Sequence, residues 1–421
     1  MDRGGIHPPL FWGFVGLLLF MIGDGVESGY LAPYLRDSGI SDGRVALVFS
    51  VYGVTAAVAA WCSGALSDLW GPRRVMALGL SIWVGFEIAL LLLGLPGPSY
   101  AMVLLSYGLR GFGYPLFAFG FLVWITAATP QHRLGTGVGW FWFAFTAGLP
   151  TVGSYLASGT IPLIGQYATF WLSLGLVVVG GLVALVGLRE RTGFAPLAPA
   201  GQRPLSTLTA SLTILWQRPR IGAGCVVRTI NTAAQYGFLV ALPGFFTDQI
   251  GFSLERWLQL LGFMFASNIV WNLIFGVIGD HIGWRRTVVW CGGVGCAVST
   301  LLLYYVPLAT ESYLLSSLVG ALYGATLAGY VPLSALMPSM VPEQRGGAMA
   351  ALNLGAGASA FVGPAVVGLV LGPWGVQGVM WMFSGMYVVS AVLATVLTLP
   401  AATSERSAEP THELAEANAS A

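Results

Sequence analysis

Long apolar stretches recur from one end of the chain to the other, and they constrain its fold more than any other feature. Each holds enough residues to cross a hydrocarbon core of roughly 30 Å at about 1.5 Å per residue. A segment in lipid must satisfy its own backbone hydrogen bonds, so it is a helix or part of a closed barrel, and these stretches are too long for barrel strands. Because 56% of the residues are hydrophobic and only 8% are charged, the sequence predicts an all-α integral membrane protein.

Twelve transmembrane helices are expected. Their ranges are 10–35, 45–67, 75–95, 99–127, 134–159, 166–188, 221–247, 256–278, 287–308, 312–338, 346–371 and 376–400. The polar, acidic residues 401–421 have no apolar period and are expected to form a disordered cytoplasmic tail.

The distribution of arginines predicts the orientation, because basic residues in short loops are retained on the cytoplasmic side. If both termini are cytoplasmic, most of the eighteen basic residues lie inside. Only Arg36, Arg44 and Arg256 then lie outside, and Arg110 and Arg228 fall within spans. We therefore expect a multi-pass protein of the plasma (inner) membrane with both termini in the cytoplasm.

The chain repeats itself at an offset of 212 residues. GALSDLWGPRR at 64–74 is answered by GVIGDHIGWRR at 276–286. The matched residues are Gly64, Asp68, Gly71, Arg73 and Arg74 in the first copy, and Gly276, Asp280, Gly283, Arg285 and Arg286 in the second. This register predicts a parallel duplication with an N-terminal six-helix bundle (1–188), a cytoplasmic linker (189–220) and a C-terminal six-helix bundle (221–400).

The repeated pattern G-x-x-x-D-x-x-G-x-R-R, after the second and eighth spans, resembles the signature of the major facilitator superfamily. The resemblance implies substrate binding between two bundles near the membrane midplane and alternating access by rocking. The ten matched residues are then expected to take part in gating. Gly64 should let neighbouring helices approach closely, and the arginine pair should provide charge partners for Asp68 and for helix ends. The alternative is that the arginines only fix the topology.

Charged residues within the spans are candidates for function, since each costs at least about 2.5–3.5 kcal/mol to insert. Asp24 and Glu27, in the stretch GDGVESGY, are three residues apart and share one face of the first helix. Arg110 in the fourth span lies near the depth of Glu27. This predicts an ion pair from which an arriving proton would release the arginine, so Asp24, Glu27 and Arg110 are the proton-coupling candidates. A static ion pair remains the alternative, and Glu87 in the third span is a further candidate.

Polar and aromatic side chains within the spans are candidates for substrate binding. Arg228, Asn231 and Gln235 form one helical stripe, Asn268 and Asn272 share a face of the eighth helix, and Asn353 lies in the eleventh. These groups could bind substrate hydroxyls or simply link helices. Tyr114, Trp140 and Trp142 could stack against the C–H faces of a polyhydroxylated solute.

A narrower resemblance is carried by PLFWGF, MIGDGVESGYLAPYL, LRGFGYPLFAFGFLVW and VGWFWFAFTAGLP. Together they look like the polyol permease branch of the superfamily, the ribitol and arabinitol transporters. The resemblance implies proton symport of a sugar alcohol, with Asp24, Glu27 and Arg110 as the residues able to carry proton and substrate.

Two other functions stay open at this point. The first is an organic-acid permease in which Arg110 or Arg228 holds a substrate carboxylate, and the second is a non-transporting sensor on the same fold. An enzyme is not expected, because G-x-S-x-G, H-E-x-x-H and G-x-x-x-x-G-K-[ST] are missing.

The expected partners are the small solute, protons and membrane lipid, with no nucleic acid, and the chain is expected to be monomeric. No cofactor or metal is expected. The four cysteines, Cys62, Cys225, Cys291 and Cys296, are interpreted as small buried hydrophobes.

Overall fold

The computed structural model describes residues 8–97, 99–130, 134–188, 192–196, 212–341 and 345–398. The elements of the first half are η1 (Pro8–Leu10), α1 (Phe11–Ser28), α2 (Leu31–Asp37), α3 (Asp42–Trp70), α4 (Pro72–Ala89), η2 (Leu90–Gly94), α5 (Tyr100–Arg110), α6 (Gly113–Ala128), α7 (Leu134–Thr146), η4 (Ala147–Val152), α8 (Gly153–Ile164), α9 (Gln166–Gly187) and η5 (Thr192–Phe194).

The second half continues in the same style. Its elements are α11 (Pro219–Gly244), η6 (Phe245–Gln249), α12 (Leu254–Ile282), α13 (Trp284–Thr287), η7 (Val288–Val294), α14 (Gly295–Thr310), α15 (Tyr313–Ala328), α16 (Leu333–Met340) and α17 (Arg345–Thr395). Several predicted spans are thus built from two or three consecutive elements, joined by π-helical turns or by short breaks.

The twelve-helix all-α fold is confirmed. Within the described ranges, nine helical segments are long and apolar enough to cross a membrane by length and composition. The longest, Gly347–Thr395, holds two spans, because Gly375 leaves the helical conformation with φ 62° and ψ −168°. The two remaining spans, α7 to α8 and α11, are not among these nine segments, and both contribute residues to the cavity between the halves described below.

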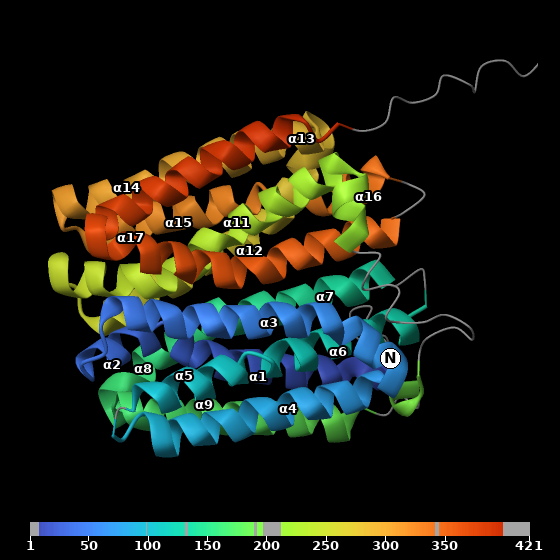
Figure 1. Cartoon of the computed structure of the whole chain (residues 1–421), viewed down its shortest axis with the longest axis horizontal. Coiled ribbons are helices and arrows are strands. Elements are labelled where there is room, and N and C mark those ends of the chain that lie inside the picture. The colour runs from blue at the N-terminus through green and yellow to red at the C-terminus, as the bar shows by residue number, and fades with distance from the viewer. Residues whose placement is uncertain are drawn as a thin grey trace, which may run out of the picture.

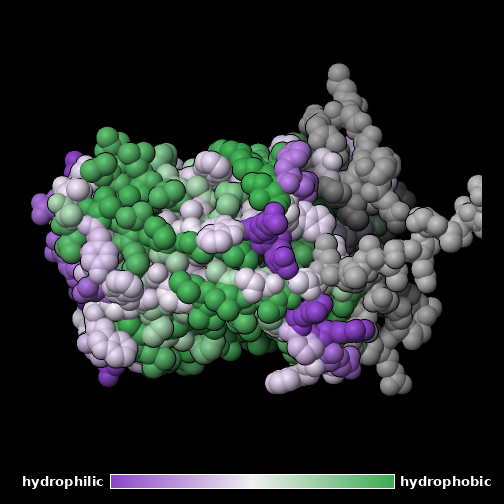
Figure 2. Space-filling model, turned by 90° about the horizontal axis from the view of Figure 1, so that it is seen from above, coloured by the Kyte–Doolittle hydropathy of each residue, from purple (hydrophilic) through white to green (hydrophobic). Residues whose placement is uncertain are grey.

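The helices form two bundles that lie side by side, α1 to α9 in one and α11 to α17 in the other (Figure 1). The first described helix begins, and α17 ends, at the end of the molecule that carries the two repeated motifs, which we call the motif end. The opposite end, which carries the turns at Gly39 and Gly251, is called the far end. Apolar side chains cover the flank between polar groups gathered at both ends (Figure 2), as a lipid-facing surface requires.

Small residues let the two bundles pack closely where α3 meets α17. A Cβ on Gly53 would collide with the backbone of Ala360, and one on Gly357 would press against Ala57. Close packing of small residues is the usual way in which helices associate in lipid, where no hydrophobic force drives them together.

The expected disordered tail, 401–421, and most of the expected linker lie outside the described residues. Two pieces of the expected linker are described, 192–196 and 212–220. The first contains η5, which packs against the motif end of the first half. The ring of Phe194 lies 4.9 Å from the guanidinium of Arg73.

Candidate functional site

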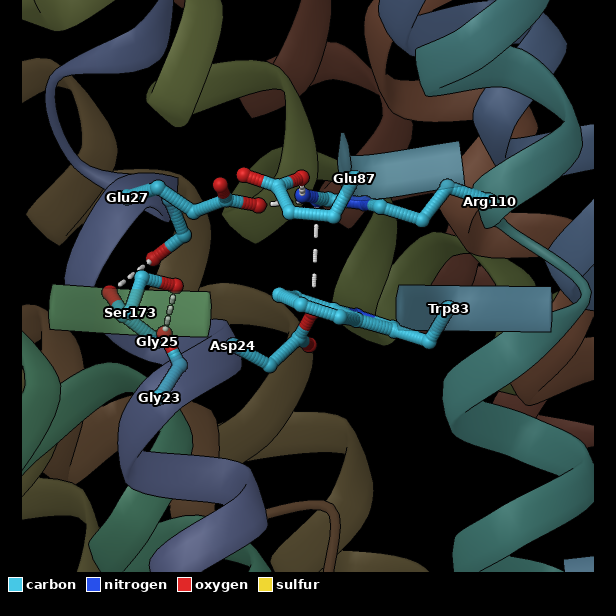
Figure 3. A network of polar contacts seen from close by, with 9 residues as sticks. Gly23, Asp24, Gly25, Glu27, Trp83, Glu87, Arg110 and Ser173 are labelled. Carbon is cyan, nitrogen blue, oxygen red and sulfur yellow. Dashed lines mark hydrogen bonds and ion pairs between the residues drawn. The ribbon is translucent and has the colours of Figure 1, made fainter. Parts of the chain in front are cut away.

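A buried charged cluster lies in the middle of the first half (Figure 3). Arg110 forms ion pairs with Glu27 through Nη2 and with Glu87 through Nη1. A third carboxylate, Asp24, has its Oδ1 4.0 Å from Nη2. All four side chains are at most 4% exposed. The expected pair between Arg110 and Glu27 is present, and Glu87 joins it as a second partner.

Three elements bring these four residues together. Asp24 and Glu27 lie one turn apart on α1, Glu87 lies near the end of α4, and Arg110 ends α5. The chain then bends through Gly111 before α6 starts. A Cβ on Gly111 would collide with Thr55, so a glycine is required for this bend to pack against α3.

Aromatic rings surround the guanidinium. It lies 4.7 Å from the ring centre of Trp83, 4.5 Å from that of Tyr107 and 5.7 Å from that of Tyr52. Such rings stabilise a desolvated cation through their negative faces. Trp83 also donates its indole N–H to Asp24 Oδ1 at 2.7 Å. Sequence reasoning missed these three rings, because single aromatic residues in apolar helices carry no signal of their own.

A cavity lies between the two halves beside this cluster. The first half contributes Asp24, Ser28, Phe49, Tyr52, Tyr107, Arg110, Tyr114, Leu149 and Pro150, and the second half contributes Gln235, Tyr236, Leu239, Phe265, Ala360 and Pro364. Glu27 and Glu87 do not line it. Asp24 is therefore the carboxylate that faces the cavity, whereas the two glutamates lie behind it in the bundle.

Some of the predicted substrate-binding residues line the cavity and others do not. Tyr114 and Gln235 line the cavity. Trp140 and Trp142 lie on α7, are 39% and 38% exposed, and are not among the lining residues. Asn353 is exposed on α17.

The other predicted asparagines take part mainly in packing. Asn268 donates to the carbonyl of Gly324 at 3.0 Å, and Asn272 donates to Asn268 at 3.2 Å. This matches the helix-linking alternative. Asn231 is buried, and its carbonyl accepts the hydroxyl of Tyr387 at 3.1 Å.

Arg228 differs from Arg110, although both arginines lie within the bundles. Among the described residues no carboxylate forms an ion pair with Arg228, and its buried Nε has no hydrogen-bond partner. It lies on the same stripe of α11 as Gln235, seven residues away, which is about 10 Å along a helix. Its charge is thus left for another group to balance.

The two repeated motifs form matching turns at the motif end. Gly71 and Gly283 have φ of 85° and 101°, a conformation that favours glycine. Arg73 donates to the carbonyl of Leu185 near the end of α9, and Arg285 donates to that of Thr395 at the end of α17, 3.5 Å away. The arginines thus bind carbonyls at helix C-termini, where the dipole favours a cation.

Two expectations about the motif were wrong for this conformation. A Cβ on Gly64 or Gly276 would meet nothing within 4 Å, so neither glycine mediates close helix packing here. Asp68 forms no ion pair with Arg73 or Arg74 in the part of the chain that the structure describes. Asp280 instead accepts the indole N–H of Trp284 at 2.8 Å. Gly64 and Gly276 lack close neighbours because the close small-residue contacts between the halves lie elsewhere, at Gly53 and Gly357.

A polar contact between the halves lies near the far end. Pro33 has no N–H, so the carbonyl of Gly29, four residues earlier, lacks its helical donor. Trp257 of α12 supplies that donor from the opposite half, with Nε1 2.9 Å from the oxygen. Arg36 makes a second contact, to the carbonyl of Val240 on α11.

Comparison with known proteins agrees with this architecture. The model of the Major Facilitator Superfamily matches residues 13–333 and 259–420. The alpha-ketoglutarate permease of Bacillus subtilis is 43% identical over 400 residues, which cover 95% of this chain and 91% of that protein. The D-arabinitol transporter of Klebsiella pneumoniae is 35% identical over 395 residues, 93% of each chain.

A solved structure shows the same fold. The crystal structure of a mutant of the nucleoside transporter NupG superposes with a TM-score of 0.76 at 15% identity, and the match covers 93% of this chain and all of that one. Two helical bundles with a cavity between them define a secondary transporter rather than an enzyme. The chain belongs to the Major Facilitator Superfamily.

Proposed function

We propose that this transporter carries a small organic acid, with 2-oxoglutarate as the first candidate, by proton symport and alternating access. The observation that carries the proposal is the uncompensated charge of Arg228 on α11. A partly buried cation that forms no ion pair with the described residues favours binding of an anion. Arg110 is less suited to that task, because Glu27 and Glu87 already neutralise it. The similarity to the alpha-ketoglutarate permease supports the same class of substrate.

Asp24, Glu27 and Arg110 are the proposed proton-coupling residues. Three carboxylates gather around one guanidinium, so the cluster has more titratable groups than its cation can neutralise. Protonation of a carboxylate next to the cavity would change both the charge of the cluster and the hold on Arg110. A location in the plasma (inner) membrane with cytoplasmic termini is also proposed, from the arginine distribution of the loops. Import is proposed because an inward proton gradient drives a symported solute inward.

A polyol is the second candidate substrate. The cavity presents the side chains of Tyr52, Tyr107, Tyr114, Gln235 and Tyr236, which suit a neutral, hydroxyl-rich solute. The similarity to the D-arabinitol transporter favours the same reading. The two candidates differ in one requirement, since a neutral polyol does not need the charge of Arg228.

The test is uptake of radiolabelled 2-oxoglutarate, ribitol and arabinitol into proteoliposomes, with and without a protonophore. We expect uptake of 2-oxoglutarate that collapses with the protonophore. In Arg228→Gln the KM should rise about tenfold or more, because an ion pair with substrate is worth about 1.5–3 kcal/mol. Arg256→Gln, which removes an exposed arginine from the start of α12, is the matched control. Uptake of a polyol but not of 2-oxoglutarate would overturn the proposal and favour the second candidate.

A further inference from the structure

In the charged cluster, two glutamates pair with a single guanidinium, which can neutralise only one of them. The guanidinium of Arg110 presents one nitrogen to Glu27 and another to Glu87, and both glutamates are fully buried. Figure 3 shows the two carboxylates side by side at the end of the arginine. One guanidinium carries one positive charge, so one of the two glutamates is left without a counter-charge if both are ionised.

Unsatisfied oxygens mark the same place. Glu27 Oε2 and Glu87 Oε1 are buried and have no hydrogen-bond partner among the described residues. A buried carboxylate oxygen without a donor is unfavourable, whereas a proton on one carboxyl would make it a donor to the other. Two carboxylates held this close share a proton and titrate as a pair.

Asp24 has a different environment. It faces the cavity, and its Oδ1 accepts the indole N–H of Trp83. The other titratable groups around the glutamates are the tyrosines Tyr30, Tyr52 and Tyr107 and the guanidinium of Arg110.

We propose that Glu27 and Glu87 together hold the single transported proton, and that Glu87 is therefore a proton-coupling residue equal in weight to Glu27. In the loaded state one carboxyl is protonated and the other carboxylate pairs with Arg110, which leaves this trio neutral. In the unloaded state both carboxylates are ionised on the same guanidinium, and the trio carries one negative charge. Asp24 lies on the path between cavity and pair. This inference rests on the proposed proton symport.

Two transport assays on the full-length protein in proteoliposomes separate coupling from binding. The first measures accumulation of solute driven by an imposed pH gradient of one unit. One coupled proton supports about tenfold accumulation in that gradient, because a pH unit corresponds to a factor of ten in equilibrium. The second measures exchange of labelled for unlabelled solute at equal pH, which needs no net movement of protons.

We expect Glu27→Gln and Glu87→Gln each to reduce accumulation from about tenfold to about one, while exchange continues. Either glutamine leaves one carboxylate paired with Arg110, a neutral arrangement that needs no proton. Glu311→Gln, at an exposed position between α14 and α15, is the matched control. Glu87→Asp keeps the carboxyl group and should retain accumulation.

Parent-like accumulation by Glu87→Gln would overturn the inference. A parent that fails to exchange 2-oxoglutarate contradicts the proposed substrate instead. The same variants are then assayed with whichever polyol the parent exchanges. Their ratio of accumulation to exchange still tests the role of Glu87. Melting temperatures of the variants in detergent identify any loss that comes from misfolding.

Discussion

The two halves repeat one helical plan but differ in the chemistry of their cores. At the offset of 212 residues, Asp24 corresponds to Tyr236, Glu27 to Leu239 and Glu87 to Ser299. The first half buries a cluster of acidic and basic side chains, whereas the second buries a network of hydroxyls. In that network Tyr323 bonds to Tyr387 at 2.8 Å, and Tyr330 bonds to Ser390 at 2.9 Å.

This difference separates two tasks that a proton-coupled transporter must perform. The charged cluster contains carboxyl groups that can take up or release a proton, whereas the network of the second half consists of neutral hydroxyls. Under the proposed function, the first half responds to protons, whereas the second half keeps a constant charge and supplies Arg228 for the substrate. Both halves contribute residues to the cavity.

The largest effect should come from removing the positive charge of Arg110, at the centre of the charged cluster in the first half. Arg110→Leu leaves two buried carboxylates without a counter-ion, and we expect a loss of about 3–5 kcal/mol in stability and no measurable transport. Thermal unfolding in detergent and uptake in proteoliposomes measure the two losses.

A triple variant sharpens this test by giving the first half the neutral character of the second. Arg110→Leu combined with Glu27→Leu and Glu87→Ser should recover most of the stability and none of the proton-driven accumulation, because replacing a buried ion network by apolar groups is often neutral or stabilising. A stable Arg110→Leu single variant would contradict the view that this arginine balances buried charge.

A smaller effect is expected where the halves touch near the far end. Trp257→Phe removes the donor to the Gly29 carbonyl, and we expect a loss of about 0.5–1.5 kcal/mol, measured by thermal unfolding. Pro33→Ala supplies a backbone N–H to the same carbonyl. In the Pro33→Ala background the tryptophan substitution should therefore cost less, as a double-mutant cycle will show. Equal costs in both backgrounds would mean that the carbonyl does not depend on Trp257.

The smallest effect should come from the neutral network of the second half. Tyr387→Phe removes a hydroxyl that bonds to Tyr323 and to the Asn231 carbonyl. Polar contacts between membrane helices are worth about 0.6 kcal/mol on average, so stability should fall by about that amount. The ratio of accumulation to exchange should stay as in the parent. A loss of gradient-driven accumulation in this variant would contradict the view that only the first half responds to protons.

Some features of the site could be predicted from the sequence and others could not. Glu27 and Arg110 were predicted to meet because a charge in a membrane span needs a partner, and their depths agree along helices of known rise. The second contact of Arg110, to Glu87, was not predictable to the same degree, since depth alone does not tell which face α4 turns toward α1. The prediction that Gly64 lets neighbouring helices pack closely was wrong for a related reason, because such packing depends on which conformation the two bundles adopt.

By itself, the sequence determined the membrane location, the twelve helices and the duplication. These follow from the hydrophobicity of single segments and from residues matched along one chain, so they need no knowledge of the third dimension. Only the tertiary structure decided that two glutamates share one arginine, that Asp24 alone of the three carboxylates faces the cavity, and that Arg228 forms no ion pair within the described part of the chain. Those properties depend on the rotation and packing of helices far apart in sequence, where a few ångströms separate an ion pair from an unbalanced charge.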